Sequence, residues 1–141
     1  MATENSALTA GVHHVGLTVS RLEDSAGFFT GLLGWQEVRR DDSYPAIFVS
    51  DGRVMLSLWA AHPAGQQTAQ AFNKDSNIGL HHLALQVESK DALHEIYRRL
   101  LDEAVHIEFP PELLRDGPAQ HMMCFEPSGI RLEFIWPGEP N

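Results

Sequence analysis

The chain has 141 residues, 43% of them hydrophobic, and its 19 acidic against 10 basic residues give a formal net charge of −9. A chain of this length can bury a hydrophobic core without cross-links. Basic residues do not cluster beyond pairs such as Arg39-Arg40 and Arg98-Arg99. We therefore expect no binding to nucleic acid, which requires a concentrated basic face.

Cys124 is the single cysteine, so no internal disulfide can form, and a metal site would have to use histidine and carboxylate side chains. The N-terminal sequence has no basic run followed by an apolar segment, and no run of about 18 apolar residues occurs. These features predict a cytoplasmic protein that does not bind or span a membrane.

In the first half of the chain, a strand is predicted over residues 14–19, where apolar and polar residues alternate. An amphipathic helix follows, with Ser20 and Glu23 as a capping box at its start and Gly34 as a stop at its end. The next three runs resemble strands: WQEVRR (35–40), AIFVS (46–50) and RVMLSLWA (53–60).

The second half repeats this order. The stretch HHVGLTV beginning at His13 returns as HHLALQV beginning at His81, and further identities keep the same alignment: Gly11 with Gly79, Leu32 with Leu100, Leu33 with Leu101. A helix is predicted from about Ser89 to Leu101. Three strand-like runs follow it: AVHIEF (104–109), HMMCFEP (121–127) and GIRLEFIW (129–136).

Each half is therefore predicted as a β-α-β-β-β module, and the fold class is α+β. We expect a single domain over residues 1–141, with module one at 11–60, a polar linker at 61–78 and module two at 79–137.

Alternation also predicts which polar side chains share a face, because residues two apart on a strand point the same way. If the apolar residues pack on the helices, the opposite faces of the first, fourth, fifth and eighth strands carry polar side chains: His14, Ser57, His82 and Glu133. Two histidines and one carboxylate form a set that binds divalent metals and leaves positions open for substrate. The alternative is hydrogen-bonded histidines and a salt bridge from Glu133 to Arg131. His13 and His81 have the apolar parity and are predicted to be structural or to support the ligands.

The stretches HHVGLTV, HHLALQV, SAGFFTGLLGW and FEPSGIRLEFIW resemble the vicinal oxygen chelate superfamily, which includes glyoxalase I, extradiol dioxygenases, fosfomycin-resistance proteins, methylmalonyl-CoA epimerase and bleomycin-binding proteins. The resemblance implies a U-shaped, eight-stranded mixed sheet. It also implies one divalent ion per site, Fe, Mn, Zn or Ni, held by His14, His82 and Glu133. Ser57 departs from the pattern, since glyoxalase I usually has Glu or His at that position.

The resemblance further implies a small-molecule substrate with adjacent oxygens and a homodimer with two equivalent sites. His121 and Arg131 are candidates for proton transfer or for contact with a substrate anion. The pocket wall is expected at four residues: Met55, Ser57, Trp59 and Met123.

Three functions stay open at this point. The first is a metal-dependent enzyme with isomerase, lyase or dioxygenase chemistry. The second is a metal-free protein that sequesters a small hydrophobic compound or antibiotic. The third is a degenerate scaffold or regulatory partner.

Overall fold

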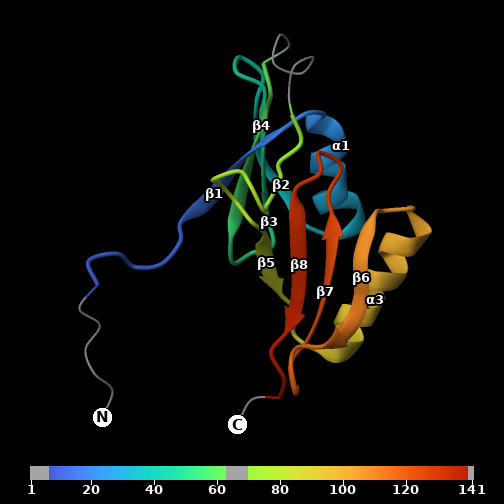
Figure 1. The fold of residues 1–141 in the computed structure, drawn as a ribbon. Helices are drawn as coiled ribbons and strands as arrows, with labels where there is room; N and C mark the ends of the chain where they lie inside the picture. Colours follow the sequence, from blue (N-terminus) through green and yellow to red (C-terminus); the bar gives the residue numbers. More distant parts are fainter. Residues whose placement is uncertain (1–6, 63–69, 140–141) are drawn as a thin grey trace.

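Each half of the chain folds as a strand, a helical segment and three further strands, so the predicted order of elements is confirmed (Figure 1). The computed structural model describes residues 7–62 and 70–139. The first half contains β1 (His14–Val19), α1 (Leu22–Gly27), the π-helix η1 (Phe28–Leu32), β2 (Gln36–Asp41), β3 (Ala46–Ser50) and β4 (Met55–Ala60). The second half contains β5 (Leu83–Gln86), α3 (Lys90–Asp102), β6 (Ile107–Leu113), β7 (Gln120–Phe125) and β8 (Arg131–Trp136).

The eight strands form two mixed sheets of four strands, one from each half, in the orders β1-β4-β3-β2 and β5-β8-β7-β6. In both sheets the first strand runs parallel to the last strand of its half, and the other pairs are antiparallel. The two sheets therefore share one topology, which is the structural basis of the repeat in the sequence.

The apolar faces predicted for β1, β4, β5 and β8 lie in or against the core, whereas β2 is exposed along most of its length. One hydrophobic cluster contains residues from both halves, including Leu17, Val19, Leu56, Leu58, Leu85, Leu132 and Phe134. Burying apolar side chains is the main favourable term in folding. Because the core takes one face of each sheet, the polar residues of the opposite parity are directed away from it.

The first helical segment differs from the sequence expectation in two ways. The predicted capping box is wrong: Arg21 is the residue before the helix and makes no side-chain cap, while Ser20 bonds to Ser128 instead. The segment also changes from α1 to the π-helix η1, where the hydroxyl of Thr30 donates to the carbonyl of Ala26. A side chain that competes for a helical carbonyl disturbs the regular bonding pattern. In α3, by contrast, Ser89 caps the helix by accepting from the Ala92 N–H at 3.0 Å.

A buried carboxylate joins the two halves. Glu126, which follows β7, is 2% exposed. It accepts hydrogen bonds from the Ser25 hydroxyl of α1 at 2.6 Å and from the backbone N–H groups of Ser128 at 2.5 Å and Ile130 at 3.2 Å. The turn between β7 and β8 is thereby fixed against the helix of the other half.

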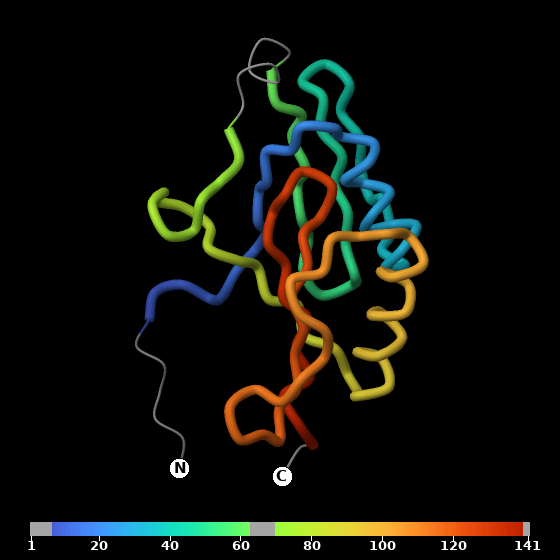
Figure 2. Tube along the Cα trace, turned by 45° about the vertical axis from the view of Figure 1, so that its right-hand side comes forward, coloured from blue at the N-terminus to red at the C-terminus, as the bar shows by residue number. Residues whose placement is uncertain are grey.

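The connection between the halves is described in part, since residues 63–69 of the predicted linker and residues 1–6 at the N-terminus lie outside the described residues. Residues 70–80 form a loop next to β1 before the chain enters β5, as Figure 2 shows in yellow-green. A turn from Asn73 to Asn77 shapes this loop. Among the helices in the described part of the chain, none has the length and apolar character needed to cross a membrane.

Candidate functional site

Glu133 lies at the centre of the candidate site. Its position on β8 has the polar parity, yet its side chain is only 11% exposed. The carboxylate lies between two histidines: Oε1 is 3.2 Å from Nε2 of His82, and Oε2 is 2.6 Å from Nδ1 of His121. At the shorter distance the ring N–H of His121 donates to the carboxylate. The structure thus brings together two of the three predicted ligands and one of the two predicted catalytic residues.

The hydrogen bonds around His82 define which of its nitrogens carries a proton. Arginine can only donate, so Nδ1 of His81, which lies 3.3 Å from Nη1 of Arg131, is an acceptor without a proton. Nδ1 of His82 lies 2.8 Å from Nδ1 of His81, so Nδ1 of His82 must carry the proton and donate it. The lone pair of a neutral His82 is therefore on Nε2, directed at Glu133.

Nε2 of His82 and Oε1 of Glu133 are both acceptors and face each other, so this arrangement requires a cation or an additional proton. Nε2 of neutral His82 and the carboxylate of Glu133 repel each other at 3.2 Å unless a cation is shared or His82 takes a second proton. Two donors that each bind one metal ion at about 2.1 Å are themselves separated by about 3.0 to 3.5 Å. His82 and Glu133 therefore fit two positions in the coordination shell of a divalent ion.

His14, the third predicted ligand, is placed elsewhere. His14 is the first residue of β1, and its Nδ1 lies 2.9 Å from Nδ1 of His13. His81 and His82 form the equivalent contact in the second half. Within residues 7–62 and 70–139, no three His, Cys, Asp or Glu side chains converge as a metal site. Cys124 is directed away from this face, because its side chain is buried in the hydrophobic core, where burial raises the pKa of the thiol to about 12.

The predicted pocket residues lie on β4 and β7. Ser57 and Met123 are buried, while Met55 and Trp59 are partly exposed. The ring of Trp59 packs edge to face against Tyr44 and Phe48, with centroids 5.2 and 5.8 Å apart. The absence of a side chain at Gly16 avoids crowding on this face, because a Cβ there would be 3.2 Å from the Ser57 hydroxyl.

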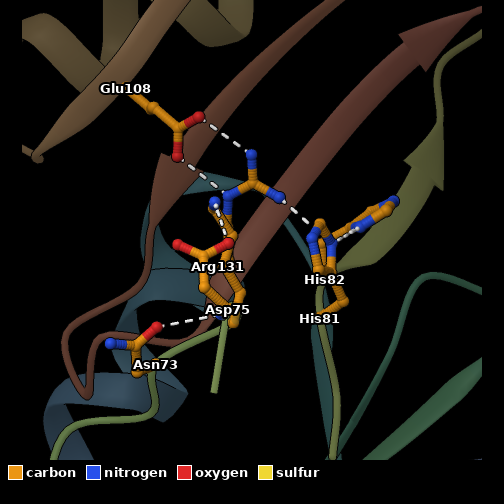
Figure 3. A network of polar contacts seen from close by, with 7 residues as sticks. Asn73, Asp75, His81, His82, Glu108 and Arg131 are labelled. Atoms are coloured by element: carbon orange, nitrogen blue, oxygen red, sulfur yellow. Dashed lines mark hydrogen bonds and ion pairs between the residues drawn. The ribbon is translucent and has the colours of Figure 1, made fainter. Parts of the chain in front are cut away.

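None of those four residues lines the cavity of about 740 Å³ that lies between β1, residues 70–75 and the start of β8. Arg131 and His81 lie in its wall. Figure 3 shows the guanidinium of Arg131 between Glu108 and His81, with two hydrogen bonds of 2.8 Å to the Glu108 carboxylate. These hydrogen bonds hold the pKa of Glu108 below its usual value.

Sequence reasoning did not identify Glu108, Tyr44 or Phe48 as members of these surfaces. The strands of Glu108 and Phe48 were predicted, but the pairing of these strands and its register were not, and Tyr44 lies in the turn before β3. Glu108 had a weak signal in the sequence, since a carboxylate on β6 could pair with an arginine on the same sheet.

The sequence model of the family described as Glyoxalase/Bleomycin resistance protein/Dioxygenase superfamily matches residues 11–134. A sequence search of curated proteins finds no match. Among solved structures, a glyoxylase/bleomycin resistance protein/dioxygenase domain from Frankia sp. EAN1pec is 26% identical, with a TM-score of 0.80 over 94% of this chain and 96% of that one.

Two further solved structures are similar in fold. The genomically encoded fosfomycin resistance protein from Listeria monocytogenes is 16% identical, with a TM-score of 0.71 over 92% of this chain and 94% of that one. The lactoylglutathione lyase from Agrobacterium tumefaciens is 17% identical, with a TM-score of 0.69 over 92% of this chain and 96% of that one. At these identities the similarity concerns the fold alone.

Proposed function

Because the chain belongs to the Glyoxalase/Bleomycin resistance protein/Dioxygenase superfamily, we propose that it is a metal-dependent enzyme acting on a small metabolite with two adjacent oxygens. The reaction is an isomerase or lyase reaction, or a dioxygenase reaction. One observation carries this proposal: the Nε2 lone pair of His82 faces the Glu133 carboxylate at 3.2 Å. The lactoylglutathione lyase of the same fold supports an enzymatic role.

His82 and Glu133 hold one divalent ion, Fe, Mn, Zn or Ni, in this proposal. When bound, the ion supplies Lewis-acid activation to a substrate that chelates it through two oxygens. His81 accepts the Nδ1 proton of His82 and so keeps Nε2 free. His121 donates to the far oxygen of Glu133 and fixes the orientation of the carboxylate. Such contacts to ligand side chains raise metal affinity.

The third ligand is His14 of a second copy of the chain. Within one chain, His14 does not join the other proposed ligands in a three-ligand group among the described residues. His13 contacts the ring of His14 through Nδ1, as His81 contacts the ring of His82. A two-fold symmetric dimer in which each chain donates His14 to the other forms two equivalent sites. The enzyme is therefore proposed to be a homodimer.

Cobalt(II) substitution tests the proposed chemistry. A Co(II) ion bound by histidine and carboxylate should give visible absorption bands in the wild-type protein. These bands should shift when acetohydroxamate, which carries two adjacent oxygens, is added, because the site keeps open positions. The variant His94→Ala, on the exposed face of α3, should behave as the wild type. Absent bands would favour a metal-free protein that sequesters a small hydrophobic compound, and bands insensitive to acetohydroxamate would contradict a metal site with open positions.

A further inference from the structure

The cavity beside β1 combines apolar residues with four charged side chains: Lys74, Asp75, Glu108 and Arg131. Apolar residues line it from β1, from the loop at residues 70–80 and from the end of β7, among them Val15, Phe72, Leu80 and Phe125. Phe72 is held in place against Gly79, where a Cβ would meet its ring at 2.9 Å. A volume of about 740 Å³ is within the range of small-molecule sites. Such sites are mainly apolar, with few polar groups that select the ligand.

Arg131 is the cation positioned to select a ligand here, since Lys74, the other cation in the lining, pairs with its neighbour Asp75. The side chain of Arg131 is 14% exposed and is held at one end by His81, 3.3 Å from Nη1. Nε and Nη2 form a two-pronged contact with Glu108. A planar guanidinium matches a carboxylate in this geometry. The position that Glu108 occupies is thus also the position that the carboxylate of a ligand would take.

Glu108 is the more solvent-exposed partner of the pair, since its side chain on β6 is 34% exposed and that of Arg131 is 14% exposed. An exposed carboxylate can leave an ion pair at small cost, because water solvates it well. Arg131 cannot move away in the same manner, because its backbone is in the interior of the sheet between β5 and β7. When the carboxylate of a ligand takes this position, Arg131 keeps a carboxylate partner and the displaced Glu108 carboxylate is solvated by water.

We propose that this cavity binds the carboxylate of an amphiphilic acid on Arg131, and that Glu108 occupies the same position until the ligand displaces it. The apolar wall takes the body of the ligand. Arg131 lies two residues before Glu133 on the same face of β8, so the carboxylate is bound beside the proposed metal site. The substrate class is therefore a monocarboxylic acid with an apolar body. Naming this substrate class rests on the proposed function, whereas carboxylate binding in the cavity needs no metal.

The test uses 4-phenylbutanoate and its uncharged amide as probes, both without adjacent chelating oxygens, in buffer containing EDTA. Calorimetric titration of the wild type should give tighter binding of the acid by about tenfold, as expected for a hydrogen-bonded charge pair. Arg131→Gln should remove this preference and leave amide binding unchanged. Glu108→Gln should raise the affinity for the acid by about tenfold, because the competing carboxylate is gone.

The Glu108→Gln result separates the proposal from a purely structural ion pair, which predicts equal or weaker acid binding. Arg131→Lys, which keeps the charge without the planar fork, should fall between the wild type and Arg131→Gln. Arg53→Gln breaks a fully solvated pair with Glu88 elsewhere and should change nothing. Three results would overturn the proposal: equal binding of acid and amide by the wild type, binding of neither probe at millimolar concentration, or acid binding by Glu108→Gln that is equal to or weaker than that of the wild type. Because EDTA removes the metal, these binding results do not depend on the proposed metal chemistry. The cobalt experiment tests that chemistry separately.

Discussion

Replacing Glu133 with glutamine should abolish metal binding. The wild type purified without chelator is expected to hold about one divalent ion per chain, and Glu133→Gln close to none. The substitution keeps the volume of the side chain but removes the negative charge that faces Nε2 of His82. Neutral amides are poor ligands for these metals, so affinity should fall by more than about a hundredfold. Elemental analysis after dialysis measures the content directly.

Two further variants distinguish a direct ligand of the metal from a residue that supports a ligand. His82→Ala should also lose the ion, whereas His121→Ala should bind it about tenfold to a hundredfold more weakly, because His121 acts through Glu133. His94→Ala should keep the full content. Wild-type metal content in Glu133→Gln would show that the carboxylate is no ligand, and equal loss in His121→Ala and His82→Ala would contradict the separate roles assigned to them.

The largest effect on stability is expected from Glu126→Ala. The truncation leaves two backbone N–H groups of the β7–β8 turn and the Ser25 hydroxyl without their acceptor in a buried place. Each unsatisfied buried group costs about 1–3 kcal/mol. Because water enters the gap in part, we expect the free energy of unfolding to fall by about 2–4 kcal/mol. Urea titration followed by circular dichroism provides the measurement.

A matched control is Glu112→Ala on the exposed side of β6, which should change stability by less than about 0.5 kcal/mol. Ser25→Ala removes one of the three bonds to Glu126 and should cost about 1 kcal/mol. A Glu126→Ala protein as stable as Glu112→Ala would mean that water replaces the lost carboxylate and that this contact does not join the halves.

The strands and helices could be predicted because their cause is local. Alternation of Val15, Leu17 and Val19 with polar residues needs no partner to be recognised, and the same alternation placed His14 and Glu133 on the polar faces. The internal repeat supported these assignments, since the same order of elements is expected in each half and is found there.

The contacts that shape the site depend on register and packing, which local periodicity does not contain. His121 was a candidate from its residue type, but its bond to Glu133 follows from the antiparallel pairing of β7 with β8. The capping box at Ser20 failed for the same reason, since Ser128 from the other half supplies a competing partner. Glu108 and Glu126 act through residues distant in the chain, so the sequence around each one does not identify its partner.

Metal content of mixed dimers tests most directly whether two chains share each site. His14→Ala and Glu133→Ala chains carrying different tags are co-expressed, and the metal bound by each pure variant is compared with that of the mixture. If His14 comes from the second copy, a mixed dimer keeps one intact site and loses the other. Random pairing then restores roughly one quarter of the wild-type content, concentrated in the doubly tagged fraction. A doubly tagged fraction as empty as the pure variants would contradict a site shared between chains.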